Sequence, residues 1–355
     1  MVQKQELPGI QILRGVAALA VVVHHTLDEA LAGRAGPVSP DWLITLCAAG
    51  VDVFFVISGL IMLYVSFGGA TQPPPPKRFL VRRLSRVFPL YWVCVAAILL
   101  LRSIGLFSSA DISPLALLLA VTLLPGHSLV YVAWTLTFEL YFYAIFAMTL
   151  VARSKPVAIC GSIAAIIAIM IGAGALPAST ARTFLTHPIA LEFCFGMLVA
   201  WLFMRQQRFP FPLVLIVTGS SLLVLTSIFI EAPNTGGLGP WHRTLAWGIP
   251  AALIVAGCCS VAIKDGSATK LAVLLGDASY SIYLSHIFVM IVYARLLKST
   301  VLGNVHQGAI ISAVVFGSAI VGVAVHIAIE KPIIAFFRRR RAAATTVSPQ
   351  SVAAP

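Results

Sequence analysis

The sequence of 355 residues has little charge: only 10% of its residues are Asp, Glu, Lys or Arg, while 59% are hydrophobic. A soluble protein carries roughly 25% charged residues. Long apolar runs recur from one end of the chain to the other. This composition excludes a soluble globular domain and indicates an integral membrane protein.

The sequence also lacks the cysteine and histidine spacings of a metal site. Its six cysteines lie inside or beside apolar runs, and we expect them to be buried, reduced and inert. We therefore expect neither a metal nor a bound cofactor. Lys and Arg outnumber Asp and Glu by 24 to 12. These basic residues lie between the apolar runs, a pattern that orients spans and favours anionic lipid headgroups over nucleic acid.

Ten apolar stretches are long enough to cross a bilayer, which takes about 20 residues of helix. They are 9–31, 42–67, 87–106, 134–152, 157–176, 187–204, 212–230, 244–263, 278–297 and 308–329. The first is longer than the apolar core of a secretory signal and contains two histidines, so we interpret it as a span. A further stretch, 112–124, is short and is expected to be re-entrant or interfacial. The predicted fold class is an all-α membrane bundle.

The basic residues also predict the direction of insertion. With a cytoplasmic N-terminus, 18 of the 24 Lys and Arg residues fall on the cytoplasmic side and six outside. If 112–124 were a span, the sequence FFRRRR would lie outside, against the positive-inside rule. We therefore expect both termini in the cytoplasm, a transmembrane domain over 1–337, and a basic and then disordered tail over 338–355. The last span is expected to end at Glu330, with Pro332 stopping the helix.

Arg14 and His25 lie near opposite ends of the first span. Eleven residues of helix turn by about three full turns and rise about 16 Å, so both side chains share one face. His24 points about 100° away, which favours His25 as the partner of Arg14 and a structural role for His24. Asp28, three residues beyond His25, is placed to orient the imidazole.

Carboxylates occur inside the apolar spans, where they are expected to be paired, protonated or functional. Asp52 lies near mid-depth, and its partner is expected to be Arg14 or a histidine. Glu139 is predicted at the level of His25, and Glu192 near the outer end of its span. Several buried ionisable groups on different spans indicate one polar cavity in the bundle.

Arginines cluster before the third span in the sequence KRFLVRRLSRVFPLYW. Arg82, Arg83 and Arg86 share a helix face at three- and four-residue spacing. They fit either a topology signal or a phosphate site, because arginine binds phosphate oxygens bidentately. In the ninth span, Tyr283 and His286 also share one face.

These residues leave three classes of function open. Ten spans with buried ionisable groups fit a membrane enzyme and equally a transporter or flippase for a lipid-linked glycan. A receptor or scaffold needs no dispersed buried charge and is disfavoured. An arginine cluster at the cytoplasmic end combined with a deeper histidine favours the enzyme.

Several segments, taken in order, resemble the acyltransferase-3 family of membrane acyltransferases, and its exopolysaccharide O-acetyltransferase branch most. They are Arg14 and His25 at R-x10-H, GVDVFFVISGL, RRLSRVFPLYW, WTLTFELYFY, LEFCFGML, ASYSIYLSHIFV and IEKP. Together they extend over residues 9–332. Where many members carry two carboxylates in the motif that corresponds to WTLTFELYFY, this chain has Glu139 alone.

The resemblance implies a multi-pass protein of the bacterial inner membrane that transfers an acyl group, acetyl from acetyl-CoA, to a carbohydrate hydroxyl. The acceptor would be an exported or cell-surface polysaccharide or its lipid-linked precursor, and polysaccharide synthesis and export machinery would be a partner. The implied catalytic residues are His25, Glu139 and Asp52. Acyl-CoA binding is implied for Arg14, Arg82, Arg83 and Arg86, and a supporting or acceptor role for Asp28, Glu192, Tyr283 and His286. An imidazole titrates near neutral pH and suits removal of a hydroxyl proton; direct attack on the thioester and an acyl-histidine intermediate both remain open.

Overall fold

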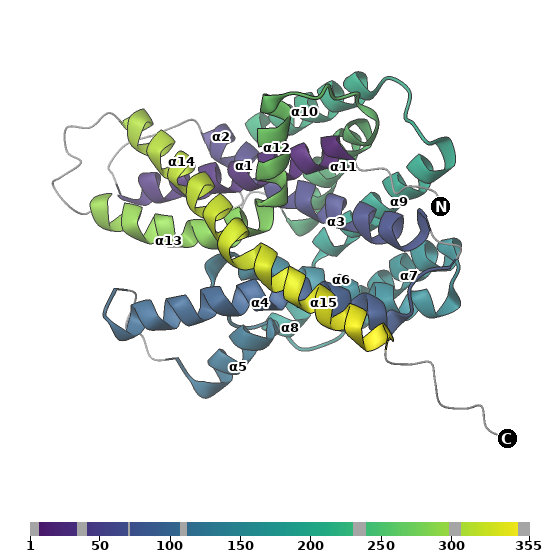
Figure 1. Ribbon diagram of the computed structural model, residues 1–355, viewed down its shortest axis with the longest axis horizontal. Coiled ribbons are helices and arrows are strands. Elements are labelled where there is room, and N and C mark those ends of the chain that lie inside the picture. The colour runs from purple at the N-terminus through teal and green to yellow at the C-terminus, as the bar shows by residue number, and fades with distance from the viewer. Residues whose placement is uncertain are drawn as a thin grey trace.

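The computed structural model describes residues 7–33, 41–69, 72–106, 112–229, 239–297 and 307–346, and within these ranges the regular structure is helical. Figure 1 shows the arrangement of the helices. They are α1 (Pro8–Gly33), α2 (Asp41–Ala48), α3 (Gly50–Phe67), α4 (Pro76–Ser103), α5 (Pro114–Thr122), α6 (Trp134–Thr149), α7 (Lys155–Gly174), α8 (Thr180–Leu185), α9 (Leu191–Gln206), α10 (Pro212–Phe229), α11 (Pro240–Ser260), α12 (Ser267–Asp277), α13 (Ser279–Leu297), α14 (Gln307–Val325) and α15 (Lys331–Thr346). Short 3-10 turns precede α6 (η1, Tyr131–Ala133) and α9 (η3, Pro188–Ala190).

The described residues contain ten helical segments that are long and apolar enough to cross a membrane, which confirms the predicted number of spans. Two of them combine neighbouring elements: α2 with α3, and α8 with η3 and α9. The expectation that both ends of the chain lie on one side of a bilayer follows from an even number of crossings and remains a prediction. That this side is the cytoplasm is likewise a prediction.

The short stretch 112–124 forms α5, a helix of 9 residues that is not among the candidate spans. The Ser113 hydroxyl accepts a hydrogen bond from the Ala116 amide and caps its N-terminus. The other end is held against α4: the Tyr91 hydroxyl donates to the Ala120 carbonyl at 2.5 Å and the Trp92 indole to the Val121 carbonyl at 3.0 Å. Its re-entrant or interfacial position remains a prediction.

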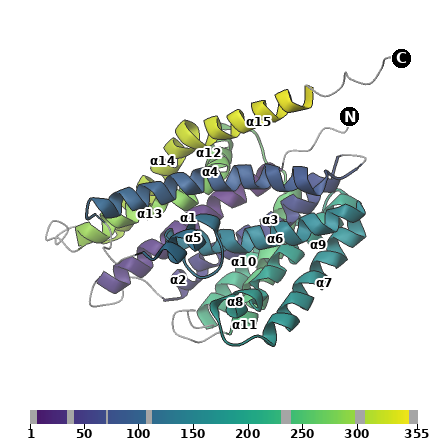
Figure 2. The same cartoon turned by 90° about the horizontal axis from the view of Figure 1, so that it is seen from below.

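Two glycines allow α3 and α9 to cross at short distance, near the centre of the bundle in Figure 2. A Cβ atom on Gly59 would overlap the Phe193 carbonyl oxygen, and one on Gly196 would overlap the Val56 carbonyl oxygen. Any larger residue would therefore force the backbones apart. Close contact through small residues is the usual way in which membrane helices associate.

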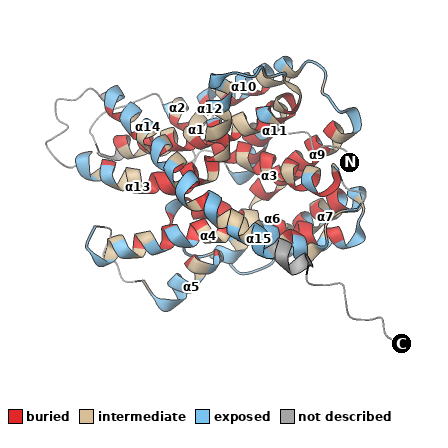
Figure 3. Cartoon of the chain, in the orientation of Figure 1, coloured by how far each residue is buried: buried red, intermediate tan, exposed pale blue. Residues whose placement is uncertain are grey.

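Burial increases toward the middle of the bundle, as Figure 3 shows for α3 and α9, whereas α5 and α10 expose most of their residues. The exposed surface is itself apolar on several spans, with large side chains such as Ile171, Val217 and Phe316 open to the surroundings. This pattern is typical of a bundle whose outer surface contacts lipid tails. Some ionisable side chains, such as Asp52 and Glu192, are nevertheless fully buried inside it.

The predicted end of the last span is wrong. A π-helical segment, His326–Glu330, joins α14 to α15, and the helix continues past Pro332 to Thr346. The two helices form one long bent rod across the bundle in Figure 1. Pro332 is tolerated because it is the second residue of α15, where its missing amide hydrogen removes little bonding beside the π segment. The first part of the predicted disordered tail is thus helical, and 347–355 lie outside the described residues.

Candidate active site

Three arginines from two helices line a cavity of about 100 Å³, which we call the arginine cavity. Arg14 comes from α1, and Arg83 and Arg86 come from α4. Its remaining wall is mainly apolar and is supplied by α3, α6 and α13. The structure therefore brings Arg14 together with two of the three arginines of the predicted cluster.

The charge of Arg14 is only partly balanced by its surroundings. Its guanidinium donates to the Gln11 amide oxygen at 2.9 Å, and only 8% of the residue is exposed. Arg86 repels it electrostatically, while Glu330, Asp277 and Glu139 attract it. Because the arginines come from separate helices, their positive charge converges on the cavity.

Arg82 and Arg83 are neighbours in the sequence but lie in different environments. Arg83 lines the arginine cavity, with its guanidinium 5.6 Å from the centre of the Phe79 ring and 5.9 Å from that of Tyr143. Arg82 is exposed and is not part of the cavity wall. Adjacent helical residues point about 100° apart, so the structure assigns the cavity to Arg83 and Arg86 and leaves Arg82 outside it.

Glu139 also lines the arginine cavity and is not part of the wall of the histidine cavity. Its carboxylate accepts hydrogen bonds from the Ser58 hydroxyl at 3.4 Å and from the Tyr143 hydroxyl. Glu139 is therefore placed to balance the arginines and to contact whatever they bind. Its predicted depth, at the level of His25, remains a prediction.

A second cavity of about 150 Å³ contains His24 and His25, and we call it the histidine cavity. Its other polar lining residues are Thr45, Tyr131, Trp134, Arg243 and Tyr283. His25 is partly exposed, and its ring lies 5.2 Å from that of Tyr131 and stacks on His286 at 5.4 Å with an angle of 14° between the planes. The His25 ring makes no hydrogen bond within the described part of the chain, so its nitrogens can face a ligand.

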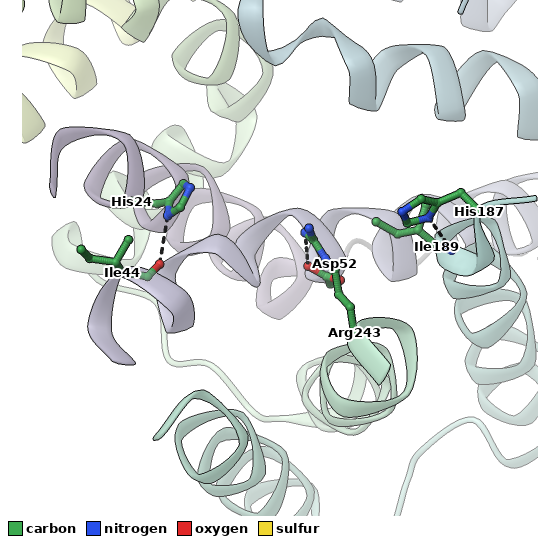
Figure 4. Close-up of polar contacts among 6 residues, drawn as sticks. All are labelled: His24, Ile44, Asp52, His187, Ile189 and Arg243. Atoms are coloured by element: carbon green, nitrogen blue, oxygen red, sulfur yellow. Dashed lines mark hydrogen bonds and ion pairs between the residues drawn. The ribbon is translucent and has the colours of Figure 1, made fainter. Parts of the chain in front are cut away.

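The neighbouring imidazoles are engaged with the backbone. The His24 Nδ1 lies 2.9 Å from the Ile44 carbonyl oxygen (Figure 4), and the His286 Nδ1 lies 2.7 Å from the Tyr283 carbonyl oxygen. A carbonyl can only accept, so each Nδ1 carries a hydrogen and fixes the orientation of its ring. Asp28 acts electrostatically on His24 and Tyr131 and forms no hydrogen bond to His25 in the described residues.

The expected partners of Asp52, Arg14 or a histidine, are wrong. Asp52 is fully buried and accepts two hydrogen bonds from Arg243, at 3.2 Å from Nε and 3.0 Å from Nη2, as Figure 4 shows. Arg243 belongs to the first turn of α11, and its guanidinium also lies 4.9 Å from the centre of the Trp247 ring. The fully buried Glu192 interacts electrostatically with this pair. Asp52 and Glu192 line neither cavity.

Arg243, which pairs with Asp52 and lines the histidine cavity, is the main residue of this region that the sequence interpretation missed. The sequence pattern assigns it to an outer loop, because the apolar stretch begins at the following residue. Two features of the sequence instead favour a place for Arg243 inside the helix. Asp52 requires a positive partner at similar depth, and Trp247 lies one helical turn after Arg243. His187 is placed near the same pair, with its Nδ1 accepting from the Ile189 amide at 3.2 Å (Figure 4).

The two cavities meet. Val51 and Tyr283 are the described residues that line both of them. The arginine cavity and the histidine cavity are thus adjacent, with these two residues between them. No group of three His, Cys, Asp or Glu among the described residues is placed to hold a metal ion.

A bundle of ten spans that encloses a basic cavity and an adjoining histidine cavity defines a membrane protein that handles a polar ligand inside the bilayer. The acyltransferase domain of the acyltransferase-3 family matches residues 7–329. The chain belongs to this family, as its motifs indicated, and it is a multi-pass membrane acyltransferase.

Two relatives cover nearly the whole chain. The "Exopolysaccharide production protein ExoZ" of Rhizobium meliloti (strain 1021) is 31% identical over 312 residues, which cover 84% of this chain and 93% of that protein. The "Acyltransferase MdmB" of Streptomyces mycarofaciens is 27% identical, and the match covers 98% of this chain and 97% of that protein. No solved structure matches the chain.

Proposed function

We propose that this protein transfers acetyl from cytoplasmic acetyl-CoA to a hydroxyl of an exported or cell-surface polysaccharide, or of its lipid-linked precursor, in the bacterial inner membrane. Membership of an acyltransferase family supports the reaction class. The similarity to a protein named for exopolysaccharide production supports the acceptor. The observation that carries the proposal is the pair of adjacent cavities, with arginines in one and His25 in the other.

The arginine cavity is the proposed donor site. Coenzyme A is a phosphate-bearing polyanion, and arginine forks bind phosphate oxygens through charge-assisted hydrogen bonds. Arg14, Arg83 and Arg86 supply such groups, while the apolar remainder of the wall suits a narrow pantetheine arm. The positive-inside rule supports placing this cavity toward the cytoplasm, where the coenzyme is made available.

His25 is the proposed base. As the acceptor oxygen attacks the thioester carbonyl, the imidazole takes the hydroxyl proton, the new C–O bond forms, the C–S bond breaks, and coenzyme A leaves as the thiolate. An acyl-histidine intermediate would use the same residue as nucleophile and would transfer the acyl group in a second step. A stable acyl adduct on His25, trapped by mass spectrometry without acceptor, would distinguish the second route.

The test of function compares the polysaccharide of cells with and without the gene. Loss of base-labile acetyl groups, with polymer still exported, is the expected result. Loss of export with acetylation intact on the remaining polymer would instead support a flippase for a lipid-linked glycan. Purified protein must also release free thiol from acetyl-CoA when polysaccharide from the deletion strain is added.

The orientation has an independent test. A reporter fused after Arg341 is expected to be active only in the cytoplasm, and one inserted at His127 only outside it. A cytoplasmic reporter at His127 would make 112–124 a span and would reverse the assignment of the later segments.

A further inference from the structure

Tyr283 separates the two cavities. Of the two described residues that line both, Val51 is small and Tyr283 carries a large planar ring. That ring is buried, with 6% of the residue exposed, and it lies 6.0 Å from the ring of Phe54 on α3 and 6.2 Å from that of His286. The boundary between the two cavities is therefore formed by Val51 of α3 and by Tyr283 of α13.

The position of the Tyr283 ring is held by its hydroxyl. The hydroxyl lies 2.8 Å from the Thr135 hydroxyl and 2.9 Å from the Val132 carbonyl oxygen, and Thr135 itself lies 3.0 Å from that carbonyl. These bonds fix the ring to η1 and α6, beside the segment from which Tyr131 contacts His25. A hydrogen-bonded buried ring stays in one rotamer, because turning it would leave these polar groups without partners.

The proposed reaction requires the donor to pass this residue. The phosphates of coenzyme A bind among the arginines, whereas the thioester carbonyl must reach His25 in the histidine cavity. The acyl group therefore lies at or beyond Tyr283 during transfer. The size of the acyl group is limited by the space between Tyr283 and Val51. The ring of Tyr283 also keeps water in the arginine cavity away from the thioester.

We propose that Tyr283 is the specificity-determining partition between the two cavities: its ring selects short acyl groups, and its bonds to Thr135 and Val132 keep the ring closed against water. This inference rests on the proposed function. Water that reaches the thioester would attack the carbonyl carbon, form a C–O bond and release the free acid and coenzyme A thiol. If the Tyr283 ring were free to move, hydrolysis of the acyl-CoA would therefore replace transfer to the acceptor.

The experiment uses the full-length protein purified in detergent, with acetyl-CoA, butanoyl-CoA and hexanoyl-CoA as donors. Thiol release is measured with and without polysaccharide from the deletion strain. Tyr283→Ala removes the ring and is expected to raise the hexanoyl-to-acetyl rate ratio at least about tenfold, since relief of methylene clashes is worth this much. Tyr283→Leu is a second variant with a smaller effect in the same direction. Val51→Phe narrows the space at this boundary and is expected to lower the ratio.

Tyr283→Phe and Thr135→Val test the exclusion of water separately from the selection of acyl chain length. Both keep the ring, so the hexanoyl-to-acetyl ratio should stay within about twofold, while acetyl-CoA hydrolysis without acceptor rises about fivefold through loss of a hydrogen bond. Tyr91→Phe is the matched control, because Tyr91 is buried and bonds a backbone carbonyl but lines neither cavity. It should change neither quantity.

The outcomes separate the inference from the function on which it rests. If the wild-type protein consumes acyl-CoA but every Tyr283 variant keeps wild-type chain-length preference and hydrolysis, the partition is overturned and the function stands. The partition is likewise overturned if Val51→Phe raises the hexanoyl-to-acetyl ratio. If the wild-type protein consumes no acyl-CoA, the proposed function fails and the partition fails with it.

Discussion

The arginine cavity and the histidine cavity are built in different ways. Two of the three arginines of the first come from one turn of α4, so a local sequence motif supplies most of its positive charge. The second is assembled from α1, α2, α3, η1, α6, α11 and α13, with a single residue from several of them. A charge cluster for binding tolerates approximate placement, whereas proton transfer needs a base within hydrogen-bonding distance of its target. The comparison therefore predicts steep losses around His25 and graded losses around the arginines.

The largest expected effect is that of His25→Ala. Loss of the base should reduce transfer by at least about 10²-fold, with the protein still inserted in the membrane. His24→Ala is the matched control, because His24 is its neighbour and bonds the Ile44 carbonyl; its expected loss is about fivefold. Polysaccharide acetyl content in cells measures both. If the His25→Ala variant kept wild-type acetylation, the expected difference between steep losses around His25 and graded losses around the arginines would be contradicted.

The next effect concerns stability. Arg243→Gln leaves the Asp52 carboxylate buried without its partner, which should lower the free energy of unfolding by about 3–5 kcal/mol. The double variant Asp52→Asn with Arg243→Gln removes both charges and should recover part of that loss. Thermal unfolding in detergent measures each. Equal destabilisation by the single and double variants would show that the charge pair is not what holds α3 to α11.

A smaller effect is expected for the donor arginines. Arg83→Ala should weaken acetyl-CoA binding about ten- to a hundred-fold, and Arg83→Lys should recover only part, because an ammonium cannot form the bidentate fork. Arg82→Ala, which changes an exposed neighbour, should weaken it by less than about threefold. Calorimetric titration of the purified protein provides the affinities. If Arg83→Lys had the acetyl-CoA affinity of the wild-type protein, the arginine cluster would be interpreted as a topology signal only.

The smallest expected effect concerns the orientation of the Glu139 carboxylate. Ser58→Ala removes a long hydrogen bond of 3.4 Å to its carboxylate and should lower the rate with acetyl-CoA about two- to fivefold. Ser162→Ala is the control, since Ser162 is fully buried but lines neither cavity. Equal rates for the two variants would show that the orientation of Glu139 is unimportant for turnover.

The sequence by itself determined the features that depend on local pattern. Apolar length predicted the ten spans, helical spacing placed Arg14 and His25 on one face, and ordered motifs indicated the acyltransferase family. These properties are readable because they depend on residues close together along one helix.

Only the tertiary structure decided which helices bring their polar groups together. It paired Asp52 with Arg243, 191 positions away in the chain, brought Glu139 to the wall of the arginine cavity, and stacked His286 on His25. It also placed Tyr283 between the cavities and continued the last helix past Pro332. The physical reason is that a buried charge must find a partner wherever neighbouring helices present one, and the order, depth and rotation of those helices are set by packing such as the Gly59 contact with α9.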